Sequence, residues 1–465
     1  MGVRLIAAGV ALGTLGDLLF QGHELGLNAV LWAGAFVLAL ALLVRFAQAP
    51  LHQGRRLMAA PLLLFALLLA WRDSALLVAV NLFAIAGAVT LGALRRTRPD
   101  RASVADYVLA AAQASSAAAA GAARILRFDV PWQELGGNLR SARAAAVGRG
   151  VALGLPLVVL FGALFVGADA IFRQLLSSAL PDVRTVWVHV LLALCFGWLA
   201  AGLLRDLVAV RGDRLLNLRR AASTEISVAL AAVDLLFLCF VLVQLRYLFG
   251  GRGLVEERVH LTYAQYARHG FFELVAVAVL VLPLLIAANT FVRSRLVRWL
   301  SFGLVALVFV VMASALQRLR LYQQEYGLTE LRLYASGVVL WLALVFALLA
   351  VTVLRGRPRP FALGAIVLGF AATLALNVLN PDALIVRTNL SRPQVDAAYL
   401  ARLSDDAVPT LLQRLPTLER PLQRSIAQAL LARDAQHDFV GWNASRARAG
   451  SLLASHHDEL VRLAR

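Results

Sequence analysis

Residues 333–354 read LYASGVVLWLALVFALLAVTVL. It contains 22 residues and no charged side chain. Because an α-helix rises about 1.5 Å per residue, a helix of this length crosses the hydrocarbon core of a bilayer, which is about 30 Å thick. The stretch therefore predicts a transmembrane helix.

The composition of the whole chain agrees with this prediction. Of its 465 residues, 60% are apolar and 15% are charged, whereas a typical soluble domain has about 25% charged residues. A chain of this composition cannot remove its apolar surface from water by folding alone. The composition excludes a soluble enzyme, a disordered chain, a disulfide scaffold and a fibrous protein.

Eleven apolar runs are long enough to be spans. They are 3–20, 27–44, 57–71, 75–94, 150–171, 185–204, 224–248, 267–291, 299–317, 333–354 and 361–379. A further run, 105–123, is rich in alanine and is flanked by arginine on both sides. Since alanine drives insertion weakly, we predict that this run is a helix on the cytoplasmic side or at the membrane interface.

The arginines predict the orientation. All 45 basic residues are arginine, and the formal net charge is +18. With eleven spans and the N-terminus inside, the inner segments hold 24 arginines and the outer loops hold 10. The positive-inside rule then places the N-terminus in the cytoplasm and the C-terminus outside. Because the arginines form short clusters between spans, without interleaved aromatic residues, nucleic-acid binding is not expected.

These observations predict an all-α fold: a polytopic helical membrane bundle of about eleven transmembrane helices, with a small helical C-terminal domain. Residues 1–94 would form a four-span block, 95–149 a basic cytoplasmic linker with the interfacial helix, and 150–379 a seven-span block. After Asn380-Pro381 the composition changes, and charges alternate with leucines at helical spacing. Residues 380–465 would thus form an extracytoplasmic helical domain.

Acidic residues inside apolar runs are the first site hypotheses, because a charge at the bilayer centre costs roughly 2.5–3.5 kcal/mol. Asp234 is the deepest acid, Glu273 lies nearer the outer surface, and Asp169 lies near the outer end of its run. Each has a structural alternative. Asp234 could serve only to pair neighbouring helices, Glu273 could belong to a packing cluster, and Asp169 could be an interfacial cap.

Six of the eight tyrosines fall in the predicted outer loops or at the outer ends of the predicted spans, together with charges of both signs. An aromatic belt alone would explain tyrosines at an interface, but the accompanying charges favour a polar outer vestibule that binds a ligand. We predict that it contains Asp169, Asp234, Arg246, Tyr247, Tyr263, Tyr266, Arg268, Glu273, Tyr322, Tyr326 and Arg332. Glu273 should lie within hydrogen-bond reach of an arginine or a tyrosine of this set.

Standard catalytic patterns are absent from the sequence. It contains no phosphate-binding loop with its lysine, no His-Glu-x-x-His helix and no Gly-x-Ser-x-Gly elbow. The cysteines Cys195 and Cys239 lack the spacing of a metal site. No catalytic residue, metal or cofactor is therefore predicted.

Four motifs carry a resemblance to known proteins. They are GADAIF at 167–172, QLRYLFGG at 244–251, YAQYARHGFFEL at 263–274 and YGLTELR at 326–332. With these motifs, residues 150–400 resemble the bacterial polytopic membrane proteins of the domain-of-unknown-function families 4153 and 4173. The resemblance implies a multi-pass bacterial membrane protein and implies no activity.

Three functions remain open. The first is a non-enzymatic protein of the bacterial cytoplasmic membrane that transports a small or lipidic solute, or senses a condition outside. Its partners would be the lipid bilayer and a small-molecule or lipid ligand, and the sequence does not identify a protein partner. The second is a membrane enzyme acting on a lipid-linked substrate at the outer face, although the first outer loop, 21–26, is short for such an enzyme. The third is a scaffold for a membrane complex.

Overall fold

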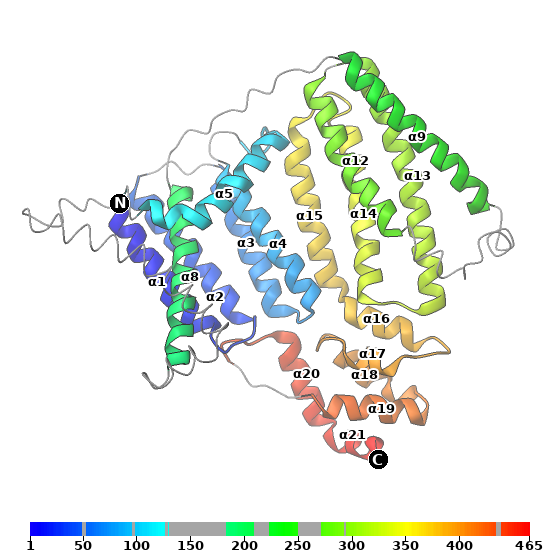
Figure 1. Cartoon of the computed structure of the whole chain (residues 1–465). Helices are drawn as coiled ribbons and strands as arrows, with labels where there is room; N and C mark the ends of the chain where they lie inside the picture. The colour runs from blue at the N-terminus through cyan, green and yellow to red at the C-terminus, as the bar shows by residue number, and fades with distance from the viewer. Residues whose placement is uncertain are drawn as a thin grey trace, which may run out of the picture. The chain divides into compact units, whose positions relative to one another are not determined.

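The structure, a computed structural model, describes residues 1–48, 53–94, 98–125, 129, 183–208, 223–249, 271–292, 294–433 and 439–465. Within these ranges every regular element is a helix (Figure 1). The predicted all-α membrane bundle is confirmed. The long helices are α1 (Gly2–Phe20), α2 (Leu27–Phe46), α3 (Gln53–Trp71), α4 (Ala75–Ala93), α5 (Val104–Arg124), α8 (Val183–Val208), α9 (Ser223–Phe249), α12 (Phe271–Phe291), α13 (Arg295–Tyr326), α14 (Glu330–Val351) and α15 (Arg359–Leu379).

Eight of the described helices are long and apolar enough to cross a membrane. They are α1 to α4, α13 to α15, and α8 from Val188 onward. The described parts of α9 and α12 add the shorter apolar stretches Ile226–Leu242 and Leu274–Thr290. These ten helices coincide with ten of the eleven predicted spans, and the remaining run, 150–171, lies outside the described residues.

Large apolar side chains on these helices remain exposed, as expected of a protein whose solvent is lipid. Phe83 on α4 is 79% exposed and Leu280 on α12 is 69% exposed. The alanine-rich run 105–123 forms α5, which is not among the helices that qualify as spans.

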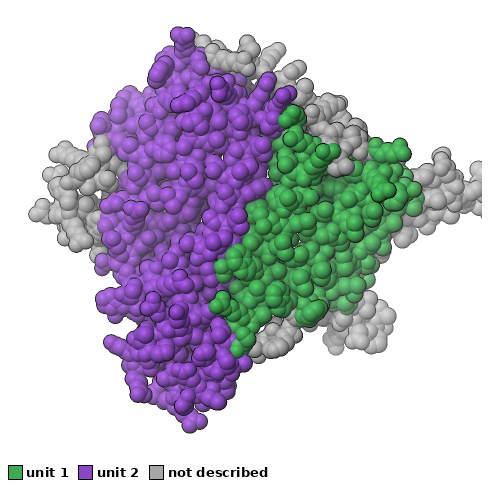
Figure 2. All heavy atoms as spheres, turned by 180° about the vertical axis from the view of Figure 1, so that it is seen from behind, with its two compact units in different colours: residues 1–99, 105–213, 435–451 green, residues 100–104, 214–434, 452–465 purple. Residues whose placement is uncertain are grey.

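The chain folds into two compact units, coloured separately in Figure 2. Unit 1 comprises residues 1–99, 105–213 and 435–451, and unit 2 comprises 100–104, 214–434 and 452–465. This grouping differs from the predicted division along the chain. Helix α8, assigned to the second block, packs with the N-terminal helices, and part of the C-terminal segment also belongs to unit 1.

Helices α1 and α8 form the closest pair of unit 1 because small residues face each other along the contact. A Cβ atom on Gly13 would lie 2.3 Å from the Ala193 carbonyl oxygen, and one on Gly9 would lie 2.8 Å from the Cβ of Ala201. Gly197 occupies the opposite side of the same contact. The two backbones therefore lie so close together that a residue larger than glycine at these positions would push them apart. Helix α5 joins the same unit, since Gly121 on α5 faces Gly202 on α8.

In unit 2, helices α9 and α12 to α15 surround a core that includes Leu304, Val308 and Phe346, each fully buried. Short helices follow α15: α16 (Pro381–Leu390), α17 (Ala397–Ala401), α18 (Val408–Arg414), the 3-10 helix η2 (Leu415–Thr417), α19 (Arg420–Leu431), α20 (Ala444–Ser455) and α21 (His457–Ala464). Of these, α16 to α19 lie at the end of unit 2 where α13 turns into α14 (Figure 1). The break between bundle and short helices falls at Asn380, whose φ of +52° ends α15 and whose side chain accepts from the Ala383 N–H to begin α16.

Candidate functional site

The connection between α13 and α14 holds the densest set of polar contacts near the predicted vestibule residues. Helix α13 has 32 residues, a length of about 48 Å, so its last turns extend beyond a bilayer's hydrocarbon core. Gly327 ends the helix with a φ of +77°, a backbone conformation that glycine adopts without strain. We call residues 322–332, with the side chains that bind them, the hairpin junction.

Asn389 on α16 fixes the turn of the hairpin junction. Its amide accepts a hydrogen bond from the Leu328 N–H at 2.8 Å and donates one to the Leu328 carbonyl at 2.7 Å. A Cβ atom on Gly327 would lie 2.7 Å from the Asn389 side-chain oxygen, so the amide fits only against glycine. The side chain thus provides hydrogen-bond partners for two backbone groups of the turn that would otherwise have none within it.

Arg392 binds the carboxyl end of α13. Its guanidinium donates to the carbonyl oxygens of Gln323 at 3.0 Å, Gln324 at 2.7 Å and Glu325 at 2.7 Å. The last carbonyls of a helix have no partner within the helix and carry the negative end of its dipole. A positive side chain here therefore stabilises α13 and links it to the short helices after α16.

Three of the predicted vestibule residues meet on the other side of this turn. The guanidinium of Arg332 lies 4.1 Å from the ring centre of Tyr322, and the rings of Tyr322 and Tyr326 are 5.0 Å apart. Arg332 also donates to the carbonyls of Tyr326 at 3.1 Å and Gly327 at 2.5 Å. The arrangement is a cation–π stack that closes the hairpin.

Tyr399 on α17 connects the start of α14 with the short helices. Its hydroxyl accepts a hydrogen bond from the Glu330 N–H at 2.9 Å. Burial raises the pKa of the Tyr399 phenol, and the nearby carboxylates of Glu330 and Asp382 add to the effect. The hydroxyl therefore keeps its proton at physiological pH, so it can also donate a hydrogen bond while it accepts from Glu330.

Asp382, in the first turn of α16, is a fully buried acid beside the junction. Its Oδ2 accepts from the Ser404 hydroxyl at 2.5 Å and from the Ser404 N–H at 3.1 Å, while its Oδ1 is buried with no hydrogen-bond partner in the described part of the chain. Burial raises the pKa of the Asp382 carboxyl to about 6, helped by the nearby Glu330 and Asp406 carboxylates and opposed by the Ser404 hydrogen bonds. The group can therefore change its charge in mildly acidic conditions.

Asp234 is not part of the hairpin junction. Its carboxyl Oδ2 lies 3.7 Å from the position that a Cβ atom would take on Gly303 of α13, so the acid faces α13 across a glycine. Gly303 and Tyr322 are 19 residues apart on α13, a separation of about 28 Å along the helix. Asp234 therefore lies in the helix bundle itself, and its Oδ1 is buried without a hydrogen-bond partner among the described residues.

The other predicted site residues cannot be placed in the same way. Arg246 and Tyr247 lie in α9 and Glu273 lies in α12, but their side chains fall outside the described part. Asp169, Tyr263, Tyr266 and Arg268 lie wholly outside it. The expected partner of Glu273 stays a prediction. Sequence reasoning missed Asp382, Asn389, Arg392 and Tyr399. The only signal near them, Asn380-Pro381, marks the start of the short helices and not a site.

No group of three or more His, Cys, Asp or Glu side chains in the described ranges is arranged to hold a metal ion. The junction instead offers hydrogen-bonding groups, an aromatic pair of which Tyr326 is exposed, and one buried carboxyl. Such an arrangement suits recognition and coupling between helices.

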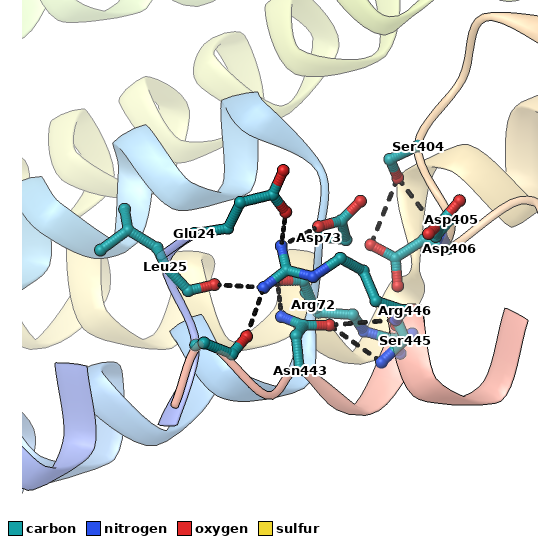
Figure 3. A network of polar contacts seen from close by, with 12 residues as sticks. Glu24, Leu25, Arg72, Asp73, Ser404, Asp405, Asp406, Asn443, Ser445 and Arg446 are labelled. Carbon is teal, nitrogen blue, oxygen red and sulfur yellow. Dashed lines mark hydrogen bonds and ion pairs between the residues drawn. The ribbon is translucent and has the colours of Figure 1, made fainter. Parts of the chain in front are cut away.

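A second polar site lies in unit 1, where residues 440–446 cross two helix connections (Figure 3). The Arg446 guanidinium binds the carboxylates of Glu24 and Asp73, each at 2.8 Å, and also donates to the Leu25 carbonyl at 2.9 Å. Asn443 donates to the carbonyls of Leu69 at 3.0 Å and Arg72 at 2.9 Å. We call this segment the tail clamp.

The tail clamp also makes backbone contacts with the first connection. The Leu27 N–H donates to the Trp442 carbonyl at 2.8 Å, and the Asn28 N–H donates to the Val440 carbonyl at 3.0 Å. The clamp therefore binds both the α1–α2 and the α3–α4 connections. Since two spans separate these connections, both lie on the same side of a membrane.

No curated protein and no solved structure matches the chain. A family model does match, over residues 59–413, and its description is "Domain of unknown function (DUF4153)". The match begins well before the motifs at 167–332 and covers α3 from residue 59 onward and all of α4, which those motifs did not cover. Because it spans more than half of the chain, the chain belongs to the DUF4153 family.

Proposed function

We propose that this protein is a non-enzymatic sensor of the cytoplasmic membrane, in which the short helices after α15 respond to a condition outside and act on the bundle through the hairpin junction. The observation that carries the proposal is the set of contacts made by Arg392 and Asn389, which bind three carbonyls at the end of α13 and two backbone groups of the turn that follows it. A displacement of these helices must move α13, and α13 runs the full depth of the bundle.

Such a sensor would respond to the binding of a small molecule or lipid, or to a fall in pH that protonates Asp382. Tyr326, 55% exposed beside Arg332, is an accessible aromatic surface at the junction. Transport of a small or lipidic solute stays a prediction from the sequence, with Asp234 as its strongest residue. An enzyme acting on a lipid-linked substrate and a scaffold for a complex also stay predictions.

The proposal is tested by hydrogen exchange on the full chain in lipid nanodiscs. Arg392→Ala removes three hydrogen bonds from a charged guanidinium, and a hydrogen bond of this kind contributes roughly 1.5–3 kcal/mol to stability. Exchange of the backbone amide hydrogens at residues 320–330 should therefore become at least about tenfold faster. A sensor also requires altered exchange at the opposite end of α13, residues 295–300. Arg424→Ala, an exposed arginine on α19, is the matched control and should change neither region. If Arg392→Ala changes exchange only at residues 320–330, the junction does not act on the far end of α13, and the proposed sensor function is wrong.

We further propose that the N-terminus lies inside the cell and the C-terminus outside. The arginine count favours this orientation. The tail clamp supports only that the two ends of the chain lie on opposite sides, since its two connections lie on the side opposite to the N-terminus. Alkaline phosphatase fused after Arg465 should be active in a bacterial host, and a fusion at Arg140 should be silent. Activity at Arg140 would reverse the assignment of every later loop.

A further inference from the structure

Two helix connections of unit 2 carry a cluster of arginines. Arg295 and Arg298 lie in the first turn of α13, and the α14–α15 connection with the start of α15 contributes Arg355, Arg357 and Arg359. Both places lie at the end of unit 2 opposite to the short helices α16 to α19 (Figure 1). We call these five residues the arginine patch.

The two halves of the arginine patch meet at Gly356. Nη1 of Arg298 lies 3.8 Å from the position that a Cβ atom would take on Gly356. This glycine stands between Arg355 and Arg357, in a turn where its φ is +79°. Arg359 begins α15 two residues after the turn. The arginines of both connections therefore belong to one surface.

The arginine patch has no counter-charge in the described part of the chain. None of its five guanidinium groups forms an ion pair or a hydrogen bond there. The sequence explains this, because no aspartate or glutamate occurs in 274–324 or in 331–381, the two segments that hold the patch. The charges of the patch are therefore available to a ligand.

Five positive charges on one surface repel one another and attract anions. The arginines at the opposite end of α13 differ, since Arg332 and Arg392 bind backbone carbonyls. Asp234, the acid of α9 that faces α13, lies against Gly303, more than one helical turn beyond Arg298. The anion that the patch attracts is therefore not one of the described side chains.

An exposed apolar surface adjoins the arginine patch on α13. Trp299 is 74% exposed and Leu296 is 57% exposed. Trp299 lies four residues after Arg295 and three after Leu296, so these side chains cover adjoining parts of one helix face. A soluble anion would leave this apolar surface in water, whereas a phospholipid can place its acyl chains on it and its phosphate beside the guanidinium groups.

We propose that the arginine patch and Trp299 form a binding site for an anionic phospholipid. The guanidinium groups donate hydrogen bonds to the phosphate oxygens, for which their geometry is suited. The acyl chains pack on Trp299 and Leu296. The site lies at the opposite end of α13 from the hairpin junction, and it depends neither on the proposed sensor function nor on the orientation of the chain.

Quenching of Trp299 fluorescence by brominated lipids tests this proposal on the full chain. Each protein is placed in phosphatidylcholine nanodiscs that contain increasing proportions of phosphatidylglycerol with brominated acyl chains. The Trp299 signal is the difference between the protein and the same protein carrying Trp299→Phe. In the wild type, brominated phosphatidylglycerol should quench this signal at a lower proportion than brominated phosphatidylcholine does.

A double variant, Arg298→Gln with Arg355→Gln, removes one charge from each half of the arginine patch. Each arginine near an anionic lipid surface contributes roughly fivefold to affinity, so the half-quenching proportion of phosphatidylglycerol should rise at least about tenfold. Neither side chain has a polar partner to lose, so this variant should fold. The control, Arg320→Gln with Arg424→Gln, removes two exposed arginines of unit 2 that lie outside the patch and should leave the half-quenching proportion unchanged.

Three outcomes would overturn the proposal. Equal quenching of wild-type Trp299 by the two brominated lipids would show that the patch does not select an anionic lipid, whether or not the variants fold. An equal loss of preference in both double variants would show that net charge, and not the patch, attracts the lipid. If inorganic phosphate raises the unfolding temperature of the wild type in phosphatidylcholine nanodiscs and phosphatidylglycerol does not, the patch binds a soluble anion instead.

Discussion

Replacing Gly13 with leucine should disrupt unit 1 more than any other single substitution in α1. The new Cβ would lie 2.3 Å from the Ala193 carbonyl oxygen and 3.0 Å from Gly197. Both neighbours are backbone, so the two helices must separate, and they lose the close packing that stabilises helix pairs in membranes. We expect a destabilisation of about 3 kcal/mol or more, seen as a lower unfolding temperature in nanodiscs.

Gly34→Leu is the matched control. Gly34 lies in α2, another span, and a Cβ atom there would have no neighbour within 4 Å. The same change in size and hydrophobicity should leave the unfolding temperature close to that of the wild type. Equal unfolding temperatures for wild type and Gly13→Leu would show that α1 and α8 do not pack as described.

Replacing Asp382 with asparagine should make the protein more stable at neutral pH. The folded-state pKa of Asp382 is about 6, above its ordinary value of 3.8, so the folded protein binds a proton more tightly than the unfolded chain. The unfolding free energy therefore falls as the pH rises from about 4 to about 6, by roughly 3 kcal/mol at 1.36 kcal/mol per pH unit. Asparagine has no charge to bury and should abolish this fall.

Unfolding of wild type and variant is compared from about pH 4 to about pH 8. The two should be similar at the acidic end, and Asp382→Asn should be the more stable at the neutral end. Asp458→Asn, on the exposed side of α21, should keep the pH profile of the wild type. Parallel profiles for wild type and Asp382→Asn would mean that Asp382 does not hold its proton in the folded state.

The spans could be predicted because each is a continuous local signal. A run of about 20 apolar residues is long and apolar enough to span a bilayer, independently of the sequence elsewhere in the chain. The bounds were less predictable for α13, expected at 299–317 but extending from Arg295 to Tyr326. Arg318 and Arg320 end the apolar run but are good helix formers, so the helix continues beyond the membrane.

The hairpin junction could be predicted only in part. Tyr322, Tyr326 and Arg332 are close in sequence and were grouped by their shared side. Asn389 and Arg392 bind groups more than 60 residues away, and no local pattern indicates such a contact. Asp382 was hidden for another reason: an acid after a proline at a helix start usually complements the helix dipole in solvent, and only the fold buries it.

Asp234 shows the same limit inside the bundle. An acid in an apolar run is conspicuous in sequence, and its depth follows from its position in the run. Its neighbour Gly303 is an ordinary glycine in a different span. The side chain that faces an intramembrane acid is therefore a property of the packed helices, which sequence spacing does not encode.

The tail clamp also has a consequence for the order of assembly during translation. Glu24 and Asp73 leave the ribosome early, whereas Arg446 is made only after all the spans described above. The α1–α2 and α3–α4 hairpins are therefore synthesised before the tail clamp that connects them. The contacts between their two connections form only after the tail clamp has been made, so these first helices are among the last to complete their contacts.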